Sequence, residues 1–307
     1  MKTQEQWLQA LGKPNSDQYE KSFKLIARYD HPDFDGELYL QSTGIRPNGE
    51  VTFQRVLMMF PKNLTGKLPA VAVPFYYPEA ALGFYPETGE IHPKFTGGNI
   101  ILDIVRHGYI AATADAYYLN YVVLPLDNDD WDRWDIVGEK INEEQPGWSG
   151  MGKLVSDTTL LVDALENDPR VDADRIGIAG HSMGGKMAFY TGCFDSRIKV
   201  MLACDLGFGW DQSNWDAPWY WGDKLADLKA QGFDHTSLLA SAAPKPFCLI
   251  AGHYDNEESR KMLASVPGYE DCPGNIFFVN HATGHRPPQY AIDAGCGFLD
   301  YWLKGNK

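Results

Sequence analysis

A serine held between two glycines constrains the fold of this chain more than any other feature. Gly180 and Gly184 flank Ser182 within the run from Arg175 to Gly185. Apolar residues before the serine predict a buried strand, and helix formers over 186–190 predict a helix after it. Gly-x-Ser-x-Gly between a strand and a helix is typical of a nucleophile elbow, in which a strained turn exposes the serine hydroxyl and crowds out neighbouring side chains. We therefore predict that Ser182 is a catalytic nucleophile.

Strand and helix signals alternate along most of the chain. The continuous apolar run 68–77 is typical of an interior strand of a parallel sheet, and the pieces of strand character within 23–59 indicate antiparallel leading strands. Further strands are expected at 108–114, 198–204, 243–252 and 275–279, and helices at 99–107, 153–165 and 289–303. The pattern predicts an α/β fold with a mostly parallel central sheet, antiparallel leading strands and helices on both faces.

The domain organisation follows from breaks in this pattern. Residues 1–22 predict an N-terminal helical extension, and 23–307 a single domain with insertions near 119–150 and 207–235. Seven of the nine tryptophans fall in or between these insertions, which we expect to form a lid over the pocket. Trp131 and Trp210 are predicted to line that pocket, where their rings would stack on a sugar or an acyl chain. The alternative is that the rings build the core of the lid itself.

Charge and cysteine content exclude several classes of partner and site. The net charge of −14, from 27 basic and 41 acidic residues, would repel nucleic acids and anionic membranes, whereas neutral or cationic small substrates are easier to admit. The first residues lack the apolar segment of a signal peptide, which predicts a cytoplasmic protein. Five scattered cysteines without Cys-x-x-Cys spacing predict free thiols, with neither a zinc site nor a disulfide framework.

A nucleophilic serine needs a base, and the base needs a carboxylate. His285 lies in the loop that follows the last predicted strand, and we prefer it to His281, which we interpret as a structural histidine. Asp255 follows one predicted strand and Asp205 follows the strand before it, so both belong at the carboxyl edge of the sheet, where ligands bind in open α/β folds. Asp255 is our first choice for the acid, with Asp205 as the rival or as a pocket residue.

The order Ser182, Asp255, His285 resembles that of the α/β-hydrolase superfamily over roughly residues 50–305. The stretches 180–186 and 235–246 are similar to dienelactone-hydrolase-like proteins and to carbohydrate esterases, including acetyl xylan and glucuronoyl esterases. The chain departs from two patterns: dienelactone hydrolases proper have a cysteine nucleophile, and glucuronoyl esterases carry their acid after the earlier strand, where this chain has Asp205.

The residues and the resemblance together predict a serine esterase that needs no metal or organic cofactor. The amides of Met183 and of Phe75 or Tyr76 are expected to form the oxyanion hole. The expected substrate is a small-molecule or oligosaccharide ester, with an acetyl ester of a sugar as the leading hypothesis. The alternatives are a glucuronoyl-type, pectin-type or feruloyl esterase, with Arg286 and Lys186 as candidates to bind a uronic carboxylate, a peptidase of the same fold, or a catalytically silent binding protein.

Overall fold

In the computed structural model, residues 1–96, 99–122 and 130–305 are described, and within them nine strands form one sheet. The order across the sheet is β1-β2-β3-β5-β4-β6-β7-β8-β9. The strands are β1 (Phe23–Asp30), β2 (Phe34–Ile45), β3 (Val51–Pro61), β4 (Leu68–Ala72), β5 (Ile110–Ala114), β6 (Val171–His181), β7 (Ile198–Cys204), β8 (Phe247–Ala251) and β9 (Ile276–Asn280).

The sheet has an antiparallel part and a parallel part. Strands β1, β2 and β3 pair antiparallel, as does β3 with β5, whereas the pairs from β5 through β4 and β6 to β9 are parallel. Short turns join the first three strands, and turns this short permit only antiparallel neighbours. Every residue of β5 and β8 is buried, as expected for strands covered on both faces. The predicted α/β fold with antiparallel leading strands is confirmed.

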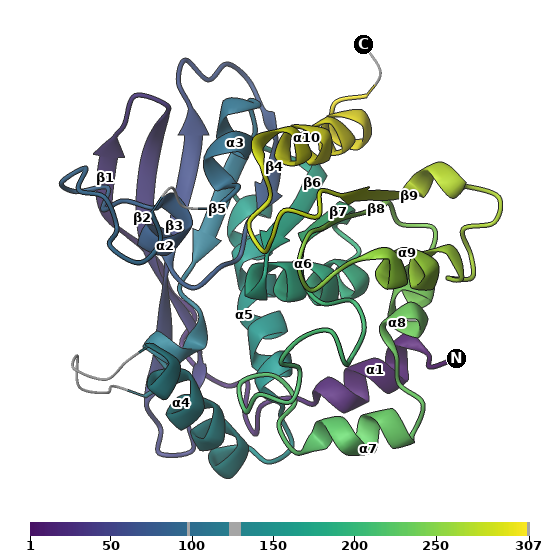
Figure 1. Cartoon of the computed structure of the whole chain (residues 1–307). Helices are drawn as coiled ribbons and strands as arrows, with labels where there is room; N and C mark the ends of the chain where they lie inside the picture. Colours follow the sequence, from purple (N-terminus) through teal and green to yellow (C-terminus); the bar gives the residue numbers. More distant parts are fainter. Residues whose placement is uncertain (97–98, 123–129, 306–307) are drawn as a thin grey trace.

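Helices cover both faces of the sheet (Figure 1). Helices α3 and α10 pack on one face together with the side chains of one hydrophobic core, while α5 and α6 pack on the other face with a second, larger core. The helices are α1 (Gln4–Leu11), α2 (Pro78–Leu82), α3 (Ile101–Arg106), α4 (Asp130–Glu144), α5 (Gly150–Glu166), α6 (Met183–Phe194), α7 (Lys224–Ala230), α8 (His235–Ala242), α9 (Glu257–Ala264) and α10 (Gln289–Leu303), with short 3₁₀ turns η1 (Tyr117–Leu119) and η2 (Pro273–Asn275).

The two predicted insertions contain helices of their own. Helix α4 lies in the first insertion and α7 in the second. Helix α1 packs on the larger core through Trp7, which is fully buried. Among the described residues, no helix is long and apolar enough to cross a membrane.

Candidate active site

Ser182 occupies the sharp turn between the end of β6 and the start of α6. Its φ of 58° and ψ of −120° are a conformation that few non-glycine residues adopt. A Cβ atom on Gly180 would lie 2.1 Å from the carbonyl oxygen of Gly184, and one on Gly184 would lie 2.1 Å from that of Pro74. Both flanking positions therefore require glycine for steric reasons, and the predicted strand–turn–helix geometry is confirmed.

The structure pairs His285 with Asp205. His285 lies in the loop between β9 and α10, and its Nδ1 is 2.5 Å from Oδ2 of Asp205, the residue directly after β7. Burial opposes ionisation of Asp205, but hydrogen bonds from His285 and from two backbone amides outweigh it and hold the pKa of this carboxyl below its usual value. The bond to an ionised Asp205 keeps the proton on Nδ1, so that Nε2 is left as the basic nitrogen of the ring.

Our preference for Asp255 as the partner of His285 was wrong. Asp255 is fully buried, and its carboxylate accepts hydrogen bonds from the amides of Gly207 and Phe208 and from the hydroxyl of Ser259. These three donors occupy both of its oxygens, and the imidazole of His285 bonds Asp205 instead. Chain order places both aspartates at the same edge of the sheet, but only the loop geometry decides which of them reaches His285.

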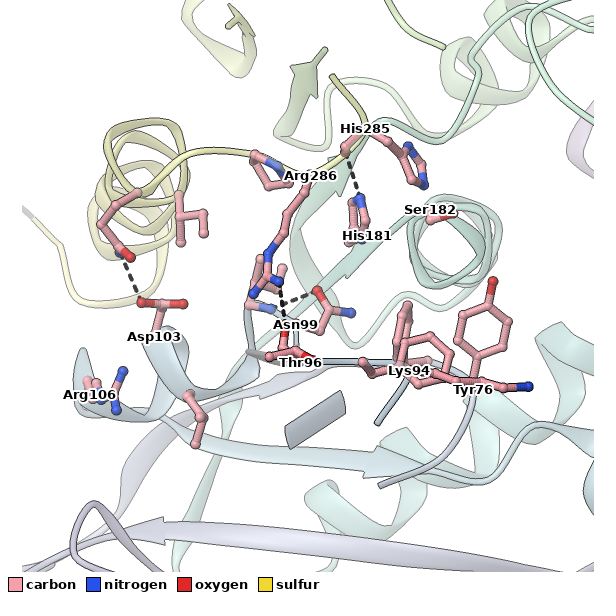
Figure 2. A pocket seen from close by; sticks show the side chains of 17 residues that line it. Tyr76, Lys94, Thr96, Asn99, Asp103, Arg106, His181, Ser182, His285 and Arg286 are labelled. Atoms are coloured by element: carbon pink, nitrogen blue, oxygen red, sulfur yellow. Dashed lines mark hydrogen bonds between the residues drawn. The ribbon is translucent and has the colours of Figure 1, made fainter. Parts of the chain in front are cut away.

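Ser182 and His285 line one cavity of about 500 Å³, together with His181, Phe75 and Tyr76. Figure 2 shows the His285 ring next to Ser182 at one end of the cavity. Among the described residues, no hydrogen bond joins the Ser182 hydroxyl to the ring; in enzymes without substrate this contact is often long. A hydroxyl, an imidazole and a carboxylate thus converge at the carboxyl ends of β6, β7 and β9.

The predicted oxyanion-hole residues lie around the elbow. Met183 is the first residue of α6, where a backbone N–H has no partner within its own helix. Phe75 and Tyr76 line the cavity, and the Tyr76 carbonyl accepts a hydrogen bond of 2.9 Å from the amide of Ala116. The close approach of Pro74 to Gly184 holds the loop after β4 against the start of α6. Which amides bind an oxyanion stays a prediction.

The tryptophans predicted to line the pocket do not do so where the structure describes them. Trp210 donates from Nε1 to the Phe233 carbonyl at 2.7 Å, and its ring centroid lies 4.0 Å from that of His235, outside the lining of the active-site cavity. Trp134, Trp215 and Trp221 are almost fully buried. The side chain of Trp131 falls outside the described residues. The alternative interpretation, in which the rings build a core of their own, fits Trp210.

The two basic candidates differ in position. Arg286 lines the cavity and donates to the Thr96 carbonyl at 2.7 Å. Lys186 is only 2% exposed and does not line the cavity; its Nζ donates to the Ser213 hydroxyl and lies over the rings of Trp215 and Tyr220. Burial lowers the pKa of Lys186 to about 7, although the charges of Asp255 and Asp205 act in the opposite direction.

Sequence reasoning missed two parts of the site. The first is His181, which lines the cavity and donates from Nε2 to the backbone carbonyl of His285 at 2.8 Å; its position next to the nucleophile was the available signal. The second is a wall of the cavity formed by residues 94–96, by Asn99 and Ile100, and by α3, which contributes Arg106. Nothing in the sequence marked this segment beyond a helix signal. Among the described residues, no group of three or more side chains could hold a metal ion.

Sequence comparisons match this chain to esterases and hydrolases. The family model "Glucuronyl esterase, fungi" matches residues 157–215, which include the elbow and Asp205. "Putative hydrolase YtaP" of Bacillus subtilis (strain 168) is 28% identical over an alignment of 167 positions, and the match covers 50% of this chain and 54% of that protein. The chain therefore spans about half the length of that curated relative.

Solved structures resemble this chain over nearly its whole length. The glucuronoyl esterase from Solibacter usitatus has a TM-score of 0.68 at 14% identity and covers 94% of this chain and 88% of its own. The acetyl xylan esterase from Paenibacillus sp. R4 has a TM-score of 0.61 at 16% identity, over 92% of this chain and 89% of its own. The chain has the α/β-hydrolase fold, and the resemblance to carbohydrate esterases of that fold is confirmed.

Proposed function

We propose that this chain is a serine hydrolase that cleaves a carboxylic ester of a carbohydrate through an acyl-enzyme. The observation that carries the proposal is the bond between His285 and Asp205, made by a histidine that lines the same cavity as the elbow serine. A base with its tautomer fixed by a carboxylate, next to a hydroxyl on a strained turn, is the arrangement that activates serine for acyl transfer.

The mechanism assigns one role to each group. Nε2 of His285 takes the proton of Ser182 as its Oγ attacks the ester carbonyl, and Asp205 stabilises the imidazolium that forms. The Met183 amide and a second amide of the Phe75–Tyr76 segment donate to the oxyanion. His285 then gives its proton to the leaving alcohol, and a water molecule, activated by the same nitrogen, hydrolyses the acyl-enzyme.

Two substrate classes compete for the cavity. An acetyl ester of a sugar or short oligosaccharide is our leading candidate, because a cavity of about 500 Å³ is far larger than an acetyl group and leaves room for the sugar. Phe75, Tyr76 and Phe95 supply aromatic surface for it. An ester of a uronic acid is the second candidate, since Arg286 lines the cavity and the fungal glucuronyl-esterase model matches the elbow region.

A panel of acetyl, longer acyl, feruloyl and methyl uronate esters, run on the wild type and on Ser182→Ala, tests the proposal. Removal of the nucleophile should lower kcat/KM by roughly 10³-fold or more on the best ester while circular dichroism stays unchanged. Near-full activity in Ser182→Ala would refute the mechanism. Preference for aminoacyl amides would indicate a peptidase, and failure of Ser182 to react with a fluorophosphonate probe would indicate a silent binding protein.

A further inference from the structure

We infer that Asp255, whose side chain is bonded to neither Ser182 nor His285, positions the Asp205 carboxylate through a reciprocal brace between the loops after β7 and β8. The inference rests on the proposed function, in which Asp205 orients His285. It gives the fully buried Asp255 a role in the reaction other than that of the acid.

Asp255 holds the loop that carries Asp205. Its Oδ2 accepts from the Gly207 amide at 2.9 Å and its Oδ1 from the Phe208 amide at 2.6 Å. Ser259, on α9, adds a third bond of 2.9 Å from its hydroxyl to Oδ1. Both carboxylate oxygens therefore have donors, and two of the three belong to the residues just after Asp205.

Asp205 holds the loop that carries Asp255 in the same way. Its Oδ1 accepts from the amides of His253 and Asp255, each at 2.9 Å, and from that of Gly252 at 3.3 Å. The other oxygen, Oδ2, is left for His285. Each aspartate thus caps the backbone of the loop that presents the other, and the position of Oδ2 depends on both sets of bonds.

The clamped loop needs this support because its backbone conformation is unfavourable. Asp205 has a φ of 48° and Gly207 one of 75°, and the first of these costs free energy in a residue with a side chain. The carbonyl oxygens of Gly207 and Phe208 are also fixed, by Nε1 of Trp215 and Nδ1 of His235, each at 2.7 Å. The peptide group between Gly207 and Phe208 is therefore held on both sides, and the carboxylate of Asp255 accepts from its N–H and from the N–H of Gly207.

Asp255→Asn separates positioning from chemistry. Asparagine keeps the shape but has one acceptor oxygen, so its amide group would face one of the two backbone N–H groups. We expect kcat to fall by about 10²-fold with KM within a factor of about three, because an angstrom-scale displacement of a catalytic group has a cost of this size. The rates are to be normalised to active sites titrated with a fluorophosphonate, so that unfolded molecules do not count.

A double-mutant cycle with Asp205→Asn provides the decisive measurement. If Asp255 acts only through Asp205, the double variant should be no slower than Asp205→Asn alone. Ser259→Ala removes one of the three donors and leaves the carboxylate, so a smaller fall in kcat is expected. This variant replaces Asp255→Asn as the test if Asp255→Asn fails to fold. Asp157→Asn is the matched control: it changes another buried aspartate, bonded to Lys153, and should lower stability but not kcat.

The results distinguish the inference from the proposed function. If Ser182→Ala is inactive, either of two results would overturn the brace. One is an unchanged kcat in Asp255→Asn; the other is a fall in kcat of the double variant equal to the product of the two single falls. If Ser182→Ala remains active, the proposed function itself fails. A loss of stability in Asp255→Asn without a loss of kcat per titrated site would show a structural role only, and would also overturn the inference.

Discussion

At the scale of single residues, the fully buried His235 and the half-buried His181 are informative beside the three groups that meet at the elbow. His235 is 1% exposed; its Nδ1 donates to the Phe208 carbonyl and its Nε2 accepts from the Tyr190 hydroxyl, both at 2.7 Å. Burial lowers the pKa of His235 to about 3 and that of His181 to about 4. Both rings are therefore neutral near pH 7, and both resist protonation in the folded chain.

This predicts loss of stability in mild acid. Between pH 6.5 and about 3, the unfolded chain binds a proton at position 235 that the folded chain does not, so the free energy of unfolding falls as the pH falls. His235 alone should account for about 2 kcal/mol between pH 7 and 4.5. Urea unfolding at both pH values measures this change.

The variant His235→Asn provides the control for this prediction. Asparagine can still donate to the Phe208 carbonyl but does not titrate, so the variant should lose less stability between the two pH values than the wild type does. Equal pH dependence in the two proteins would contradict the assignment to His235.

Single residues also show how much of the site the sequence predicts. The elbow spacing predicts Ser182, and the loop after the last strand offers His281 and His285, of which we preferred His285; the structure brings Ser182 and His285 to one cavity. Our first choice for the acid, Asp255, was wrong, because Asp205 and Asp255 follow adjacent parallel strands and the sequence does not show which of them bonds His285. The loop that makes the bonds to Asp205 and Asp255 contains a positive φ at Asp205, and no local sequence pattern predicts that angle.

At the scale of elements, the loop after β4 packs closely against the start of α6 because Gly184 has no side chain. The gap at Gly184 admits the Pro74 carbonyl, and the loop so held carries Phe75 and Tyr76 into the cavity. Positions that look alike in sequence therefore differ in what they tolerate: Gly297, in the interior of α10, has no atom within 4 Å of an added Cβ.

Alanine at these two glycines should have opposite effects. Gly184→Ala must push the Pro74 segment away from the elbow, so we expect a loss of about 1–3 kcal/mol in stability and a fall of roughly 10-fold or more in kcat/KM. Gly297→Ala should raise stability by about 0.5–1 kcal/mol and leave activity unchanged, because it restricts only the unfolded chain. Thermal unfolding and ester hydrolysis measure both; unchanged activity in Gly184→Ala would show that the loop position does not matter.

The elements that the sequence predicted best are those with strong apolar patterns. The closing helix 289–303 matches α10 at both ends, and the strand expected at 198–204 matches β7 at both ends. The strand expected over 68–77 ends at Ala72 instead, shortly before Pro74, which has no N–H with which to continue the ladder. Short helices such as α2 and α9 were missed because one or two turns give too few apolar positions to establish a period.

At the scale of the whole molecule, the N-terminal helix is part of the aromatic core formed by the second insertion. The Trp7 ring contacts those of Tyr190, Trp210, Trp221 and Phe233, with centroids 4.8–6.4 Å apart, and its Nε1 donates to Ser237 at 3.3 Å. Tryptophan counts alone could not separate a pocket lining from such a core, because both place rings in the same insertions. Within the predicted extension at 1–22, helix α1 thus buries Trp7 and Leu11 in this core.

Trp7→Ala should therefore be strongly destabilising for a residue so near the chain end. Removal of a fully buried indole costs about 3–5 kcal/mol. Urea unfolding followed by circular dichroism measures the loss, and Leu8→Ala, on the exposed side of the same helix, is the matched control, expected within about 0.5 kcal/mol. A cost below about 1 kcal/mol for Trp7→Ala would show that α1 is dispensable.

The positive φ angles have a consequence for the chain as a whole. Among the described residues, four non-glycine residues have a positive φ, and three of them, Ser182, Asp205 and Ala282, lie just beyond β6, β7 and β9. Glycine would relax these positions, yet two of them need side chains for the proposed chemistry. Strained residues at the proposed active site thus lower the stability of the folded chain. A variant with glycine at these positions would be more stable but would lack the proposed activity.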